Sequence, residues 1–330
     1  MCAVDDRGLL ALPGALARLG SKRVLVLTGP SRRYLELVLA QAGGVTVEVF
    51  AGARRHVPVE ALADARARLD AFATDTVLAL GGGSPIGFGK ALRRDGDLRF
   101  VAVPTTYAGS EMTTLWGTTS DGKKTTGRDP RVRPDVVIYD VALTVDMPLA
   151  LTVTSLMNAL AHPISVLGAR SLLEEARPQA LAASGVVFRA IESLAREPGD
   201  RAARARAQRG AGQAAQVLDG GKPGLHHTLA HLLGGRFDLD HSGLHSVLLP
   251  HTLHRLRDDA PEVFAALATA LGTPDPEARL FEWLAGAGAA TSLRALGVPL
   301  QGLQDLLAAD AALPAPLLLA AFHGRLDPDR

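Results

Sequence analysis

One stretch of the chain decides the fold, and it reads Thr76-Val77-Leu78-Ala79-Leu80-Gly81-Gly82-Gly83-Ser84-Pro85-Ile86-Gly87-Phe88-Gly89-Lys90. An apolar run typical of a buried strand leads into a glycine-rich turn, and the turn opens a helix. Glycines let the backbone approach a pyrophosphate, whose charge is held by free N–H groups at the start of the helix. We therefore predict that Gly81, Gly82, Gly83 and Ser84 bind nucleotide phosphates. The alternative is a tight turn without a ligand, and the spacing is not the GxGxxG pattern of an ordinary Rossmann fold.

Strand-like and helix-like segments alternate on both sides of this stretch. Apolar runs at residues 23–28, 45–50, 76–80 and 100–104 are typical of buried strands, with helical patterns between them, among them residues 59–72. Such alternation predicts a parallel sheet covered on both faces. From residue 151 onward the apolar spacing is helical. We predict a doubly wound α/β domain in residues 1–149 and an all-α domain in residues 150–330.

The composition points to a small-molecule partner. The 330 residues are 47% hydrophobic, and 35 basic against 34 acidic residues leave a net charge of +1, so no global field favours nucleic acid or an anionic membrane. The only cysteine, Cys2, excludes an internal disulfide. The first residues lack the features of a signal peptide, and we find no apolar run that approaches the roughly 20 residues needed to span a bilayer. We expect a cytoplasmic protein.

A second motif follows the strand-like residues 100–104. It reads Pro104-Thr105-Thr106-Tyr107-Ala108-Gly109-Ser110-Glu111. Small hydroxyl side chains at the carboxyl end of a strand lie where doubly wound sheets bind ligands, and they can hydrogen-bond phosphate or amide groups. The alternative is a serine/threonine turn that caps a helix.

Histidines are concentrated in the second half of the chain. Asn158 and His162 are four residues apart and share a helical face, as do His227 and His231. His226 adjoins the second pair, and His241 and His245 follow in a third segment. Any single histidine can be an ordinary hydrogen-bonded helix residue. Six of the ten histidines in these short segments indicate a functional cluster.

Taken together, these motifs resemble the iron-containing alcohol dehydrogenases, and within them the maleylacetate reductases. The resemblance extends over nearly the whole chain, through Lys123-Lys124-Thr125-Thr126-Gly127-Arg128-Asp129-Pro130-Arg131-Val132 and Leu248-Leu249-Pro250-His251. It implies a dehydroquinate synthase-like fold, a cleft between the domains as active site, and a homodimer. The strand that usually opens the family is expected to be absent, because only the helical residues 9–19 precede Lys22.

The resemblance also implies a ligand set. Metal-dependent relatives hold the cation with one Asp and three His, which here correspond to Asn158, His162, His227 and His241. Losing an anionic oxygen weakens a divalent site, so we expect only a vestigial site and no tightly held divalent metal. The histidines would then polarise the substrate oxygen directly, as hydrogen-bond donors.

For the cofactor, the resemblance implies NADH or NADPH. The turn Thr28-Gly29-Pro30-Ser31-Arg32-Arg33 carries no carboxylate that would repel a 2′-phosphate, and two guanidinium groups stand close by, so NADPH should be accepted. The cofactor-binding residues expected on this basis are Gly29, Pro30, Gly81, Gly82, Gly83, Ser84, Thr105, Thr106, Ser110 and Lys124.

The reaction implied is hydride transfer to an unsaturated or keto carboxylate, most simply maleylacetate, giving 3-oxoadipate. His231 is expected beside the nicotinamide, and proton delivery falls to His245 or Tyr107. Arg128 would clamp a substrate carboxylate, unless its segment is a solvated surface loop. The oxyanion site would be shaped by His162, His227 and His241. Other hypotheses are a different enone or ketone substrate, a non-redox reaction in the same pocket, and a non-catalytic binding partner.

Overall fold

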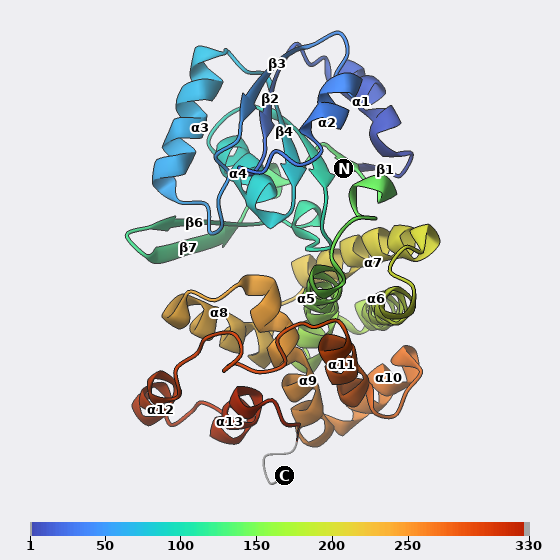
Figure 1. Ribbon diagram of the computed structural model, residues 1–330, viewed down its shortest axis with the longest axis vertical. Helices are drawn as coiled ribbons and strands as arrows, with labels where there is room; N and C mark the ends of the chain where they lie inside the picture. Colours follow the sequence, from blue (N-terminus) through green and yellow to red (C-terminus); the bar gives the residue numbers. More distant parts are fainter. Residues whose placement is uncertain (1, 327–330) are drawn as a thin grey trace. The chain divides into compact units, whose positions relative to one another are not determined.

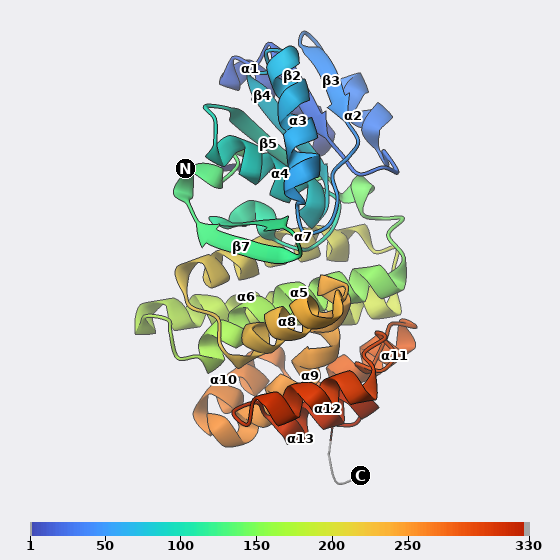
Figure 2. The ribbon, with the colours of Figure 1, turned by 90° about the vertical axis from the view of Figure 1, so that its left-hand side faces the viewer.

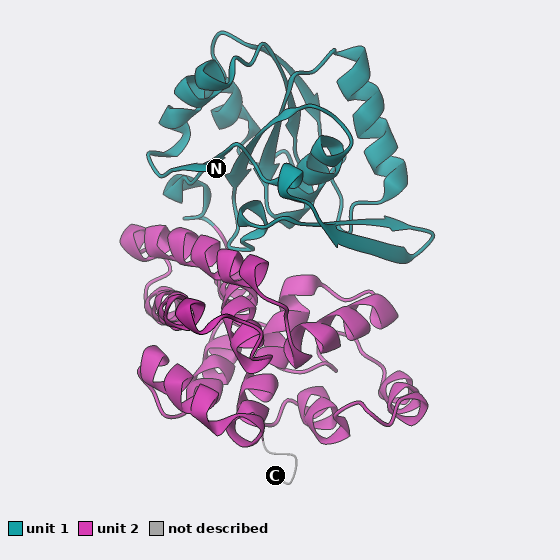
Figure 3. Cartoon of the chain, turned by 180° about the vertical axis from the view of Figure 1, so that it is seen from behind, with its two compact units in different colours: residues 1–146 teal, residues 147–330 magenta. Residues whose placement is uncertain are grey.

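The computed structural model describes residues 2–326 and divides the chain into two compact units. Unit 1 comprises Met1–Asp146 and unit 2 comprises Met147–Arg330 (Figure 3). The first contains the sheet and the second consists of helices. The predicted class, a doubly wound α/β domain followed by an all-α domain, is confirmed.

Unit 1 is built on a six-stranded parallel sheet with the order β1-β8-β5-β4-β2-β3 (Figure 1). Its strands are β1 (Ala3–Asp5), β2 (Arg23–Leu27), β3 (Thr46–Phe50), β4 (Thr76–Gly81), β5 (Arg99–Pro104) and β8 (Val136–Ile138). The chain runs from β2 to β3 on one side and returns on the other side of β2 with β4. The order therefore reverses between β2 and β4, which is where doubly wound sheets bind ligands.

Helices cover both faces of this sheet (Figures 1 and 2). They are α1 (Leu12–Leu19), α2 (Leu35–Gln41), α3 (Val59–Ala71) and α4 (Gly83–Arg94), with short 3₁₀ turns η1 (Gly8–Ala11), η2 (Ser110–Met112), η3 (Pro130–Val132) and η4 (Val141–Leu143). Val24, Leu78 and Val101 pack in one core with residues of α1 and α2. Their strand neighbours on the opposite face are equally buried. Burial on both faces explains why these strands read as continuous apolar runs.

The strands β1 and β7 of unit 1 were not predicted. β1 exists although no strand was expected there; Ala3 N–H donates to the Asp135 carbonyl and Tyr139 N–H to the Asp5 carbonyl, each at 2.9 Å. The basic segment, for which the sequence left a carboxylate clamp and a solvated surface loop open, forms β7 (Lys123–Arg128), paired antiparallel with β6 (Leu115–Ser120). Both depend on backbone bonds to a partner strand, and neither carries an apolar pattern of its own.

Unit 2 consists of packed helices. They are α5 (Leu149–Gly168), α6 (Arg177–Arg196), α7 (Arg201–Gly220), α8 (Leu225–Phe237), α9 (His241–Asp259), α10 (Pro261–Leu271), α11 (Pro276–Gly286), α12 (Leu300–Ala309) and α13 (Ala315–His323), with the 3₁₀ turn η5 (Glu174–Ala176). The arginine-rich start of α7, residues 201–208, has a sequence typical of a solvated helix face. That is wrong for Arg204, which is fully buried and donates to the Pro198 carbonyl at 2.8 Å.

The central helix α5 corrects a further expectation. Its 20 residues have a hydropathy of 1.3, which makes it long and apolar enough to cross a membrane. However, 78% of this segment is buried inside the protein. The helix is apolar because it forms the core of unit 2, where Leu156, Met157 and Leu160 are fully buried.

Candidate functional site

Three predicted segments of unit 1 meet at the carboxyl ends of neighbouring strands. Gly29 and Pro30 follow β2, the glycine turn follows β4, and Thr105 follows β5. Because β4 pairs with both β2 and β5, the three turns lie at one edge of the sheet. The N–H of Thr105 donates to the Gly81 carbonyl at 3.1 Å, which joins two of the turns directly.

The glycine turn leaves open space in front of α4. Gly81 has a φ of +143°, a conformation that favours glycine, and a Cβ on Gly82 would lie 2.9 Å from Oγ1 of Thr106. A Cβ on Gly83 would meet no atom within 4 Å. The first N–H groups of a helix have no partner within it, so those of Gly83 and Ser84 can receive an anion. The turn therefore has the form of a phosphate site.

Other candidates of unit 1 lie in different settings. Tyr107 follows the threonine pair, but its side chain is only 1% exposed, inside the unit. Ser110 begins η2. Lys124 and Arg128 lie on the exposed strand β7. The antiparallel pair of β6 and β7, called here the hairpin, thus carries two exposed cationic residues. The phenol of Tyr107 lies in the core.

Two charged residues of the quoted motifs are buried and structural. Nζ of Lys90 donates to the carbonyls of Thr113 and Leu115, at 2.9 and 2.8 Å, which ties α4 to the start of β6. The carboxylate of Glu111 accepts from the Tyr139 hydroxyl at 2.9 Å. Burial raises the pKa of Glu111. These side chains hold the segments around the glycine turn in place.

Unit 2 gathers all six predicted histidines into one group, called here the histidine cluster: His162 from α5, His226, His227 and His231 from α8, and His241 and His245 from α9. The His227 ring centroid lies 5.7 Å from that of His162 and 4.9 Å from that of His245. The His241 ring is 4.3 Å from that of His245, and His231 is 6.4 Å from His241.

The cluster has a buried end and an exposed end. His162, His226, His227 and His245 are buried, whereas His231 and His241 are exposed. Asn158, one helical turn before His162, is also buried. Within residues 2–326, no hydrogen-bond partner is present for Oδ1 of Asn158 or for Nδ1 of His162 and His227. Buried polar atoms without partners indicate a place for a ligand.

Burial keeps the inner histidines neutral. Desolvation lowers the pKa of His162 to about 4 and that of His226 to about 3. The same cause, reinforced by neighbouring imidazoles, puts the pKa values of His227 and His245 well below the usual range. A neutral imidazole offers one N–H donor and one lone pair, so it can hydrogen-bond a substrate oxygen or ligate a metal.

The chemistry of this donor set fits a divalent metal. Imidazole nitrogens suit iron and zinc, and the amide oxygen of Asn158 adds a neutral ligand. Ring nitrogens of His226, His227 and His245 lie within 4.8 Å of one another. Of these three, only His227 belongs to the set expected from the sequence. The sequence placed His226 in the cluster without a role of its own and gave no sign of Thr252, because the relation of the two residues is a contact between two helices.

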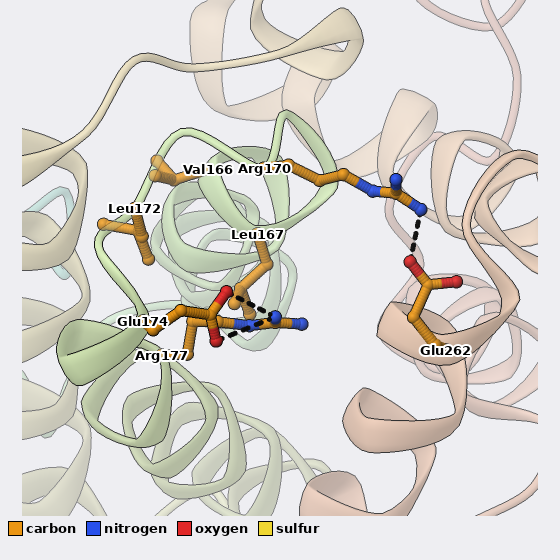
Figure 4. Close-up of a pocket in the computed structure, with 7 residues that line it drawn as sticks. All are labelled: Val166, Leu167, Arg170, Leu172, Glu174, Arg177 and Glu262. Atoms are coloured by element: carbon orange, nitrogen blue, oxygen red, sulfur yellow. Dashed lines mark hydrogen bonds and ion pairs between the residues drawn. The ribbon is translucent and has the colours of Figure 1, made fainter.

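Unit 2 also has two cavities near the end of α5. One, of about 230 Å³, is lined by Val166, Leu167, Arg170, Leu172, Glu174, Arg177 and Glu262 (Figure 4). Its cations are paired, Arg170 with Glu262 and Arg177 with Glu174, and no predicted site residue lines it. The other, of about 110 Å³, has His226 and Thr252 among its lining residues.

The fold and these two sets of residues define a family. The family model "Iron-containing alcohol dehydrogenase" matches residues 4–141, and "Fe-containing alcohol dehydrogenase family, C-terminal" matches residues 152–323. The chain belongs to the iron-containing alcohol dehydrogenase family and is an oxidoreductase, as expected from the resemblance.

Its relatives place it in the maleylacetate reductase branch. The chain is 39% identical to maleylacetate reductase 1 of Cupriavidus pinatubonensis over 96% of this chain and 93% of the relative. It is 40% identical to the Burkholderia cepacia maleylacetate reductase over 90% and 84%. The crystal structure of maleylacetate reductase from Agrobacterium tumefaciens superposes with a TM-score of 0.89 at 35% identity, covering 98% of this chain and 97% of that one.

These comparisons leave one expectation without support. The family is iron-containing, so its members give no ground for excluding a divalent metal here. The buried neutral imidazoles also fit such an ion.

Proposed function

We propose that this chain reduces maleylacetate to 3-oxoadipate with NADH or NADPH. The observation that carries the proposal is the cluster of buried, neutral histidines in a chain that is 39% identical to a maleylacetate reductase along 96% of its length. A hydride from the cofactor would add to the olefinic carbon, the electron pair would move to the enolate oxygen, and a proton would complete the product.

In this proposal the histidines stabilise the enolate. Neutral N–H donors in a water-poor environment are strong stabilisers of developing negative charge. His162, His227 and His241 would contact the oxygen, and the exposed His231 would lie beside the nicotinamide. His245 would deliver the proton, since Tyr107, the other residue expected for this role, is buried inside unit 1. Arg128 on β7 would bind a substrate carboxylate, for which its exposure on the hairpin is favourable.

The cofactor would bind at the strand ends of unit 1. The pyrophosphate would approach Gly81, Gly82 and Gly83, with Ser84 and the threonine pair as further hydrogen-bond donors. Gly29 and Pro30 would border the adenosine side, with Ser110 and Lys124 as additional contacts. Acceptance of NADPH is supported by the absence of a carboxylate in residues 28–33 and by the exposed guanidinium of Arg32.

Asn158, His162, His227 and His241 are the residues that would hold a divalent metal. When bound there, the ion supplies a Lewis acid that polarises the substrate oxygen. We further propose a cytoplasmic homodimer.

Turnover of maleylacetate with NADH and with NADPH tests the proposal, because the oxidation of either cofactor is followed directly by its absorbance. We expect saturable oxidation that depends on maleylacetate and yields 3-oxoadipate in equal amount. The turnover rates of protein as purified and of protein after chelation are compared, so that a metal requirement is distinguished from a lack of reductase activity. Tight cofactor binding without turnover of maleylacetate would instead support a different enone or ketone as substrate.

A further inference from the structure

Three side chains of α8 and α9 form a continuous hydrogen-bonded row. Nδ1 of His226 lies 2.9 Å from Oγ1 of Thr252, and Nε2 of His226 lies 2.8 Å from Nδ1 of His245. His226 is 3% exposed and His245 is fully buried. Every hydrogen bond in such a row needs one donor and one acceptor. The position of the hydrogen at one end of the row therefore determines which ring nitrogen of each histidine carries a proton.

The hydroxyl of Thr252 determines the direction of the row. Its Oγ1 lies 3.1 Å from the carbonyl oxygens of both Leu248 and Leu249. If its single hydrogen pointed at His226, Oγ1 would face two carbonyl oxygens with no hydrogen between them, which is repulsive. The hydroxyl therefore donates to the helix backbone and accepts from His226, whose Nδ1 carries a proton.

The donor and acceptor roles at His226 then determine those at His245. Within residues 2–326 the hydrogen-bond partners of the two rings are a hydroxyl and each other, with no carboxylate. A buried imidazolium without a counter-charge is costly, so both rings are neutral. With its proton on Nδ1, His226 accepts at Nε2, and Nδ1 of His245 must donate. Nε2 of His245 is left without a proton. In the described chain that buried atom has no hydrogen-bond partner.

We propose that Thr252 and His226 are positioning residues that hold His245 as the Nδ1-protonated tautomer, with the Nε2 lone pair presented inside the histidine cluster. His245 therefore meets a ligand as an acceptor: a proton or a cation is attracted to this nitrogen, and a carbonyl oxygen is repelled. The rings of His227 and His241 lie 4.9 and 4.3 Å from that of His245, so its lone pair contributes to the same site.

Two consequences follow for the site. His226 cannot ligate a metal while both of its ring nitrogens are occupied, so His245 is the member of this pair that offers a ligand atom. The second consequence rests on the proposed function: His245 must take up a proton at Nε2 before it can deliver one to the substrate. The tautomer itself stands whatever reaction the protein catalyses.

Nitrogen NMR of protein labelled with ¹⁵N-histidine tests the tautomer. Signals of His245 are assigned by their loss in His245→Gln. We expect a protonated, pyrrole-type Nδ1 and an unprotonated, pyridine-type Nε2 for His245 in the wild type at neutral pH. No substrate is present, so the result does not depend on the reductase activity. A protonated Nε2 on His245 in the wild type would overturn the proposal, and a folded His245→Gln protein is needed only to assign the signals.

Thr252→Val tests the role of the row, since valine keeps the side-chain shape and removes the acceptor. Nδ1–H of His226 then lacks a partner, so the proton is expected to move to Nε2 and donate to His245, which reverses both tautomers. Thr252→Ser keeps the hydroxyl and should give the wild-type pattern. A folded Thr252→Val protein with an unchanged His245 spectrum would show that Thr252 does not set the tautomer.

Discussion

Replacing Gly83 with alanine should strengthen the fold and weaken cofactor binding at the same time. Gly83 is the exposed first residue of α4, and a Cβ there has no atom within 4 Å. Alanine is a better helix residue than glycine, by about 0.5–1 kcal/mol, so the free energy of unfolding should rise. Gly82 is a poorer choice, because its Cβ would lie 2.9 Å from Oγ1 of Thr106 and disturb the fold.

The effect on binding has the opposite sign. The added methyl group occupies the space through which a phosphate approaches the N–H groups of Gly83 and Ser84. A hydrogen bond to a charged group contributes about 1.5–3 kcal/mol. Losing one such bond therefore raises the Kd of NADPH by about 10- to 150-fold. Gly83→Val, with a bulkier side chain in the same space, should raise it further.

Two measurements on the same protein separate the two effects. Isothermal titration gives the Kd of NADPH, and urea denaturation gives the free energy of unfolding. The matched control is Gly14→Ala in α1, an exposed helical glycine whose Cβ would lie 3.7 Å from the Arg18 guanidinium. It should gain similar stability with an unchanged Kd. If Gly83→Ala binds NADPH within about twofold of the wild type, the glycine turn is not the phosphate site.

Three further predictions concern unit 2. Asn158→Asp should raise the affinity for Zn²⁺ by about tenfold or more, measured by titration, because it restores an anionic ligand; equal affinities would argue against ligation at this position. Burial lowers the pKa of His162 from 6.5 to about 4, so between these pH values the unfolded chain holds a proton that the folded chain does not. The free energy of unfolding therefore decreases as the pH falls through this window, by up to about 1.4 kcal/mol per pH unit. His162→Gln should remove that contribution from the pH dependence of the unfolding free energy, whereas the exposed control His323→Gln should not. The third prediction concerns kinetics: His227→Ala should slow single-turnover hydride transfer by about 10²–10³ with little change in cofactor Kd. His231→Ala should alter both, and wild-type rates in both variants would make the cluster structural.

Much of the α/β unit was predictable from local sequence signals. Strands buried on both faces, such as β4 and β5, contain almost only apolar residues, and helices begin where glycine turns end. Spacing alone paired Asn158 with His162 and His227 with His231, since residues four apart share a helical face. The family motifs then supplied the class of reaction.

Features that depend on a distant partner were not predictable. β1 is three residues long and exists through hydrogen bonds to β8, and β7 is a polar strand formed by pairing with β6. Period and turn signals are local, whereas such pairings depend on which backbone groups the fold brings together.

The candidate site divides in the same way. The sequence determined which histidines occur and which share a helix face. Only the tertiary structure decided that His226 reaches Thr252 and His245 on another helix, and that Tyr107 lies in the core. The proton position on a histidine is set by the hydrogen bond at its other nitrogen, and that partner comes from packing between helices rather than from the neighbouring sequence.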